Sequence, residues 1–156
     1  MKKLLTKALL ALLLGTGIST VSAKRQPVPK MYMFGLAASF TDTIVHITPI
    51  QTLDSVWINS KNKFLLERDV YSFQLRDFLE QSLQMPHRTC IVFYNQKREK
   101  LEKEYKKMQR LYTKSKDGLQ HFDVRYLELQ QFQFKVVDMS EYEDGENTAV
   151  EEAPKE

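Results

Sequence analysis

One continuous stretch, residues 88–112, constrains the fold of this chain more than any other. Residues 89–94 (Thr-Cys-Ile-Val-Phe-Tyr) form an apolar run of strand length that is rich in β-branched and aromatic side chains. After Asn95 the pattern changes to that of a highly charged helix over residues 96–111. A buried strand that leads into a helix is half of a crossover unit, and the aromatic segment 132–137 is placed to be the returning strand.

A predicted hairpin and a predicted helix extend this framework. Residues 31–40 are almost entirely apolar, and residues 43–48 follow them as the second strand of a hairpin. Gly35 and the alanines after it indicate that another element, expected to be a helix, packs closely over this first strand. Residues 68–83 place apolar side chains at three- and four-residue spacing, which predicts an amphipathic helix that ends before Pro86.

The order of these elements is strand, strand, helix, strand, helix, strand. It predicts an α+β or α/β two-layer sandwich, with one sheet of four to five strands and two helices on the same face. Two points stay open. Residues 50–66 fit either a small hairpin or a packed loop, and residues 123–127 compete with residues 132–137 for the place of the returning strand.

The first 23 residues have the pattern of a secretory signal peptide. Lysines at positions 2, 3 and 7 precede the apolar run 8–14, and the small residues 21–23 predict cleavage after Ala23. An uncleaved anchor is the alternative, although the apolar run is shorter than the roughly 20 residues that span a bilayer. We therefore expect a periplasmic or secreted protein with no transmembrane span after cleavage.

Charge divides the rest of the chain into a body and a tail. Residues 24–30 contain Pro27 and Pro29 and are predicted to be an extended linker before a single domain over residues 31–137. Residues 24–137 hold 19 basic and 12 acidic residues, a formal charge of +7. Residues 138–156 hold eight acids and one lysine, a charge of −7, and this composition predicts a disordered acidic tail.

Known catalytic and metal-binding patterns are weakly represented in the sequence. The sharpest enzymatic hypothesis is a nucleophilic Cys90 with His46 or His87 as its base, but Cys90 lies inside an apolar run, where a thiol is usually inert. The three histidines lack ligand spacing, and a single cysteine cannot make a cysteine-rich site. No catalytic residue, metal ligand or cofactor is predicted, and an enzyme is the less favoured class.

The basic helix is the most specific functional feature. Residues 97–116 carry nine basic and three acidic side chains, a local charge of +6. The candidate binding residues are Lys97, Arg98, Lys100, Lys103, Lys106, Lys107 and Arg110. Export argues against nucleic acid as the ligand. Three interpretations remain: a solvated face that keeps the domain soluble, a surface that attracts anionic envelope components, and a face that the acidic tail screens.

Several short segments of the chain resemble small exported proteins of Bacteroidetes bacteria. The matching segments are Tyr32-Met33-Phe34-Gly35, Ser39-Phe40-Thr41-Asp42 and Pro86-His87-Arg88-Thr89-Cys90, followed by the basic helix. The resemblance covers roughly residues 31–137 and implies a single envelope domain, but it brings no activity, ligand or site.

The sequence thus favours a non-enzymatic exported α/β module that binds a protein or an anionic envelope component through its basic helix. The alternatives are a small envelope enzyme with an unrecognised site and an assembly subunit that pairs through an exposed sheet edge.

Overall fold

The computed structural model describes residues 24–114 and 118–140, which contain five strands and two helices. In chain order these are β1 (Arg25–Ala38), β2 (Ile44–Ile47), β3 (Gln51–Asn59), α2 (Arg68–Ser82), β4 (Thr89–Asn95), α3 (Arg98–Thr113) and β5 (Asp123–Tyr126). This is an α+β fold with a mixed sheet, as predicted. Its element order differs from the expected one by the extra strand β3, which lies in the segment that the sequence left open.

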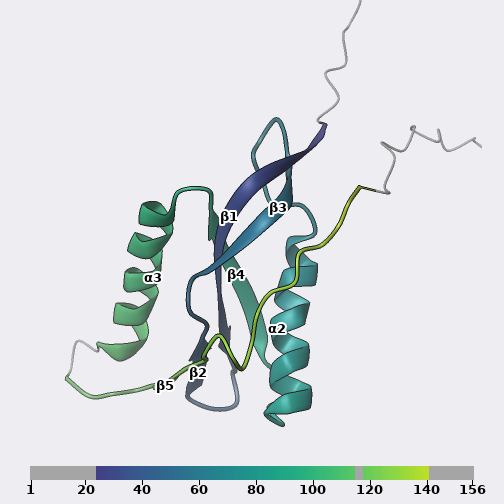
Figure 1. The fold of residues 1–156 in the computed structure, drawn as a ribbon. Coiled ribbons are helices and arrows are strands. Elements are labelled where there is room, and N and C mark those ends of the chain that lie inside the picture. Colours follow the sequence, from purple (N-terminus) through teal and green to yellow (C-terminus); the bar gives the residue numbers. More distant parts are fainter. Residues whose placement is uncertain (1–23, 115–117, 141–156) are drawn as a thin grey trace, which may run out of the picture.

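β1 is the strand around which the sheet is built (Figure 1). The predicted hairpin is confirmed, because β1 pairs antiparallel with β2, with Leu36 opposite Ile47. β1 also pairs antiparallel with β3 over residues 25–33 and with β4 over residues 32–38. The outermost strand, β5, pairs parallel with β2. β4 and β5 therefore run in the same direction with β1 and β2 between them, so the α3 connection crosses two strands.

The two helices cover opposite faces of the sheet, and the expectation that both lie on one face is wrong (Figure 1). Met33 and Ala37 of β1 pack in the same core cluster as α2. Phe34 and Leu36, whose side chains point to the other face, pack in the cluster of α3. The layers are therefore helix, sheet and helix. The physical reason is that residues 31–37 are apolar without alternation, so that both faces of β1 need cover.

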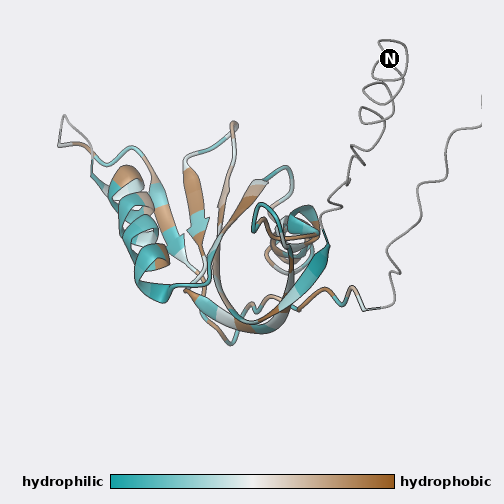
Figure 2. Ribbon diagram, turned by 90° about the horizontal axis from the view of Figure 1, so that it is seen from above, coloured by the Kyte–Doolittle hydropathy of each residue, from teal (hydrophilic) through white to brown (hydrophobic). Residues whose placement is uncertain are grey.

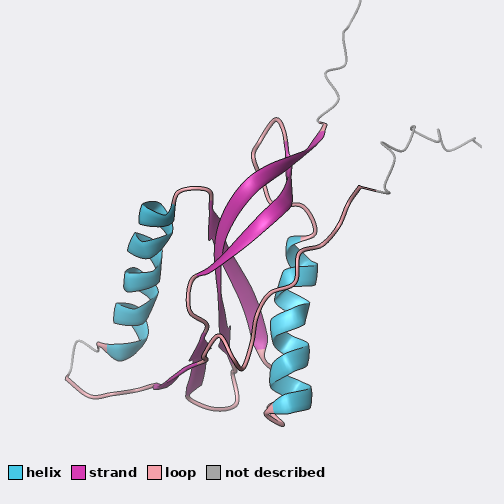
Figure 3. Ribbon diagram, in the orientation of Figure 1, coloured by secondary structure: helices cyan, strands magenta, loops and turns pink. Residues whose placement is uncertain are grey.

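Residues 132–137 do not form the returning strand that the sequence predicted (Figure 3). Phe132 and Phe134 are buried against α2, but the backbone beside them is held by glutamine side chains rather than by a neighbouring strand. The Gln51 amide donates to the Phe132 carbonyl at 3.2 Å, and its oxygen accepts from the Phe134 N–H at 2.9 Å. Gln74 makes the same two-way contact with the backbone of Lys135, at 2.9 and 2.7 Å. β5 takes the place of the last strand.

Two domain boundaries also differ from the predicted ones. Residues 25–30 belong to β1 and are not a linker. At the other end Met139 is 6% exposed, so it belongs to the packed body although the prediction placed it in the acidic tail. The predicted signal peptide and residues 141–156 lie outside the described residues. No helix in the described ranges is long and apolar enough to cross a membrane.

Candidate functional site

α3 is fixed to the sheet by one apolar stripe. Leu101 is buried, and Tyr105, Met108 and Tyr112 pack beside it against the β1 and β4 side chains of the same cluster. The ring of Phe34 stacks on Phe93 at 4.7 Å between centroids and meets the edge of Tyr105 at 4.9 Å. This aromatic contact determines which side of α3 faces the protein, and the charged side consequently faces solvent, as Figure 2 shows by its hydrophilic colour.

All seven predicted binding residues are exposed, which agrees with an outward-facing basic helix. Four of them, together with Lys114, recur at spacings of three and four residues and so form one line along the outer side of the helix. We call this line the basic ridge; it consists of Lys100, Lys103, Lys107, Arg110 and Lys114. Lys97 and Arg98 lie at the start of the helix, and Lys106 lies beside the ridge.

Acidic side chains neutralise only a small part of this face. Arg98 Nε lies 2.8 Å from Glu102 Oε1, and Lys107 Nζ lies 3.8 Å from Glu104 Oε2. Both pairs are exposed, so each contributes at most about 1 kcal/mol to stability and is screened by salt. The positive potential of the ridge therefore persists in solution.

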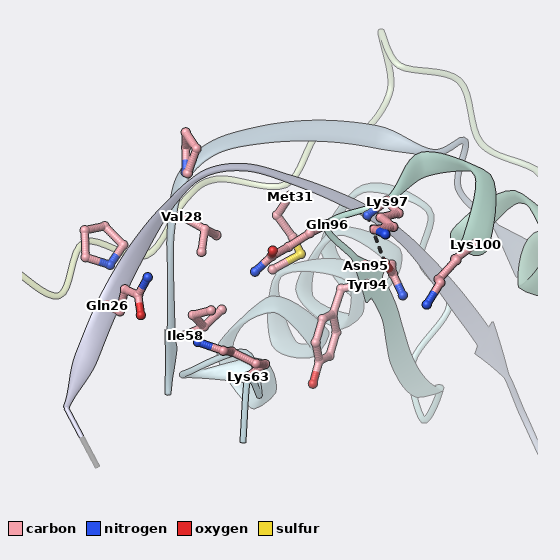
Figure 4. A pocket seen from close by; sticks show the side chains of 12 residues that line it. Gln26, Val28, Met31, Ile58, Lys63, Tyr94, Asn95, Gln96, Lys97 and Lys100 are labelled. Carbon is pink, nitrogen blue, oxygen red and sulfur yellow. Dashed lines mark hydrogen bonds between the residues drawn. The ribbon is translucent and has the colours of Figure 1, made fainter. Parts of the chain in front are cut away.

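A hollow of about 490 Å³ adjoins the N-terminal end of the ridge (Figure 4). It lies where the first half of β1 and the end of β3 face the end of β4 and the start of α3. Val28, Met31 and Ile58 supply an apolar wall, and Lys63, Lys97 and Lys100 supply three positive charges. The lining contains no aspartate or glutamate.

The turn that joins β4 to α3 shapes one side of this hollow. Asn95 Oδ1 accepts a hydrogen bond from the Lys97 N–H at 2.9 Å, which fixes the chain as it enters the helix. The Tyr94 hydroxyl accepts from the Leu65 N–H at 3.3 Å and so ties the segment after β3 to β4. Sequence reasoning found Lys97 and Lys100 but missed Lys63, because nothing local in residues 59–63 indicates that they face α3.

The structure separates the groups of the cysteine hypothesis. Ala37 pairs with His46 on one side and with Cys90 on the other, so the backbones of His46 and Cys90 lie two strand spacings apart, roughly 9.5 Å, with β1 between them. Burial raises the pKa of Cys90 to about 11, the opposite of what a nucleophile needs. His87 is exposed and precedes the strand. Cys90 is half-buried and packs against the core cluster beneath α2, whereas Ile91 beside it is 44% exposed.

His46 instead lies within electrostatic range of a polar cluster at the end of the sheet, in which Arg88 is buried and Asp42 is partly exposed. The guanidinium of Arg88 donates to both carboxylate oxygens of Asp42, at 2.6 and 3.0 Å, and to the Ile44 carbonyl at 2.6 Å. The hydrogen bond from the Ile44 N–H and the pairing with Arg88 hold the pKa of Asp42 below its usual value. The cluster ties the loop after β1 to the start of β4.

In the part that the structure describes, no three histidine, cysteine, aspartate or glutamate side chains gather closely enough to hold a metal ion. No protein-family model, curated protein or solved structure matches the chain.

Proposed function

We propose that this protein is a non-enzymatic binding module of the cell envelope, and that the basic ridge and the adjoining hollow bind an anionic component of that envelope. The observation that carries the proposal is the continuity of the two features. Lys100 belongs to both, so an extended anion that enters the hollow can continue along α3 over the other four cationic side chains of the ridge.

The chemistry of the hollow supports an extended polyanion rather than a small enzyme substrate. Three lysines offer ammonium groups, and Gln26 and Asn95 offer amides, beside a wall of aliphatic side chains. Such a lining attracts phosphate, sulfate or carboxylate groups but has no acid and base pair that could transfer protons. The elevated pKa of Cys90 and its distance from His46 also support a binding role.

A column of immobilised dextran sulfate tests the proposal. Two variants reverse charge at the site: Lys103→Glu with Lys107→Glu on the ridge, and Lys63→Glu with Lys100→Glu in the hollow. A matched control, Arg76→Glu with Lys135→Glu, changes the net charge equally at exposed positions on and beside α2, away from both features. We expect the two site variants to elute at clearly lower salt than the wild type, because ion pairs with the matrix are lost.

The control is expected to elute close to the wild-type position, and circular dichroism should show the same fold for all three variants. Equal shifts of all three would mean that the matrix senses net charge and not this site. That result would contradict the proposed function.

A further inference from the structure

Four exposed apolar side chains gather at the end of the molecule that lies opposite the hollow. They are Phe40, Leu111, Leu119 and Phe122, which are 99%, 61%, 65% and 37% exposed, and we call them the apolar tip. Single exposed apolar residues are ordinary, but several at one end of a small domain indicate a contact surface.

The topology brings these residues together from three segments. The Asp123 N–H donates to the Thr43 carbonyl at 2.9 Å, so Phe122 lies beside the loop that carries Phe40. The ring of Phe122 also meets the edge of Tyr112 at 5.1 Å, which places the end of α3 at the same location. Figure 1 shows the β1–β2 loop, the C-terminal end of α3 and the start of β5 at the lower end of the molecule.

The loop holds Phe40 outward by hydrogen bonds on both of its sides. The hydroxyl of Ser39 accepts from the Thr41 N–H at 3.2 Å and pairs with the Thr41 hydroxyl at 2.8 Å. Asp42 is anchored by Arg88, whose side chain is 2% exposed. Phe40 is therefore presented by an ordered loop, which reduces the entropy that binding would cost.

The charge around the apolar tip is positive. Among the residues described there, Asp42 is paired with Arg88 and Asp123 with Arg125 at 2.8 Å. Arg110 and Lys114, the last members of the basic ridge, lie on the same end of α3 as Leu111 and carry a surplus of two positive charges. Apolar side chains that protrude beside cations match the boundary of an anionic membrane, where acyl chains lie directly beneath negative head groups.

We propose that the apolar tip inserts into an anionic lipid surface while Arg110 and Lys114 contact the head groups. This inference rests on the proposed function and names its partner as lipid. A fluid bilayer accepts separate protruding side chains without a complementary pocket. The apolar tip presents separate side chains from three segments of the chain, and this arrangement favours a lipid surface over a protein partner.

The test uses the complete sequence, purified as the cell processes it, with vesicles of phosphatidylglycerol and phosphatidylcholine. Phe40→Ser should weaken co-sedimentation with these vesicles about tenfold, since an inserted phenylalanine contributes that much to partitioning. The matched control is Phe64→Ser, which removes another exposed phenylalanine, 63% exposed, near the opposite end of β1 and should bind like the wild type. Pure phosphatidylcholine vesicles should bind all variants weakly.

A second readout reports insertion directly. Tryptophan fluorescence of Phe40→Trp should shift to the blue on phosphatidylglycerol vesicles, and that of Phe64→Trp should not. Phe40→Ser should keep the wild-type elution salt on dextran sulfate, because the basic ridge is intact. Equal vesicle binding by Phe40→Ser and Phe64→Ser would overturn the lipid inference while leaving the proposed function standing.

Two further outcomes are decisive. If the wild type does not bind vesicles but Phe40→Ser releases a co-purifying envelope protein, the tip contacts a protein and the inference is wrong. If the wild type binds neither vesicles nor dextran sulfate, the proposed function fails as well.

Discussion

At the scale of single residues, His46 is the most unusual side chain of the core. It is 2% exposed, and its Nδ1 atom has no hydrogen-bond partner among the described residues. Burial and the nearby charges of Arg88 and Arg125 lower its pKa from 6.5 to about 4, and Asp123 and Asp42 oppose this shift less strongly. The folded protein therefore holds a neutral imidazole where the unfolded chain takes up a proton.

This difference predicts a loss of stability on acidification. Between pH 6.5 and 4, His46 is protonated in the unfolded state but not in the folded state. The free energy of unfolding should therefore decrease as the pH is lowered through this range, by up to about 3 kcal/mol. His46→Gln should remove most of this slope, as measured by urea unfolding at pH 7, 5.5 and 4.5. Asp42, with its lowered pKa, acts in a separate window below 3.8. An unchanged slope in the variant would mean that His46 is not the source.

At the scale of elements, the contact between α2 and β1 depends on the missing side chain of Gly35. A Cβ atom at this position would lie 2.6 Å from Leu75 Cδ2 and 3.1 Å from Phe134 Cζ. The small residues in the first strand thus predicted correctly that a helix packs closely over it. The backbone there is also fixed, because the Gly35 N–H donates to the Thr48 hydroxyl at 2.8 Å.

Gly35→Ala should therefore lower the free energy of unfolding by about 1–3 kcal/mol through overpacking. The same substitution should cost less in a Leu75→Val background, because valine lacks the Cδ2 atom that would collide. Urea unfolding of the four proteins gives the double-mutant cycle. Equal costs in the two backgrounds would show that the strain does not come from α2.

At the scale of the whole molecule, the charge is distributed between the body and the segment after it. Residues 141–156 contain seven acids and one lysine, and the body to which they are attached is positive. The described chain reaches Ser140 after passing over α2, where the Val137 N–H donates to the Tyr71 hydroxyl at 3.2 Å. An acidic segment of this length is able to compete with external anions for the basic ridge.

Deletion of residues 141–156 should raise retention on dextran sulfate at low salt, with the difference fading as salt screens the charges. The deletion must spare Met139, because its side chain is buried. In the Lys103→Glu, Lys107→Glu background the same deletion should give a smaller gain if the segment screens the ridge. An equal gain would instead indicate an effect of net charge alone.

The sequence by itself determined the positions of both helices and of most strands, the inward stripe of α3 and its outward basic face. Each of these depends on periodicity among residues a few positions apart. The continuous apolar run in β1 also carries the signal that both of its faces are buried.

Only the tertiary structure decided which face of the sheet each helix covers, because the side chains of β1 and β4 are apolar on both sides. It also decided that the backbone of residues 132–137 is hydrogen-bonded by the side-chain amides of Gln51 and Gln74 and not by a neighbouring strand. In addition, it placed Lys63 in the lining of the same hollow as Lys97 and Lys100. These features join residues far apart in the chain. Local patterns do not record such contacts, since they form only when the complete fold brings the partners together.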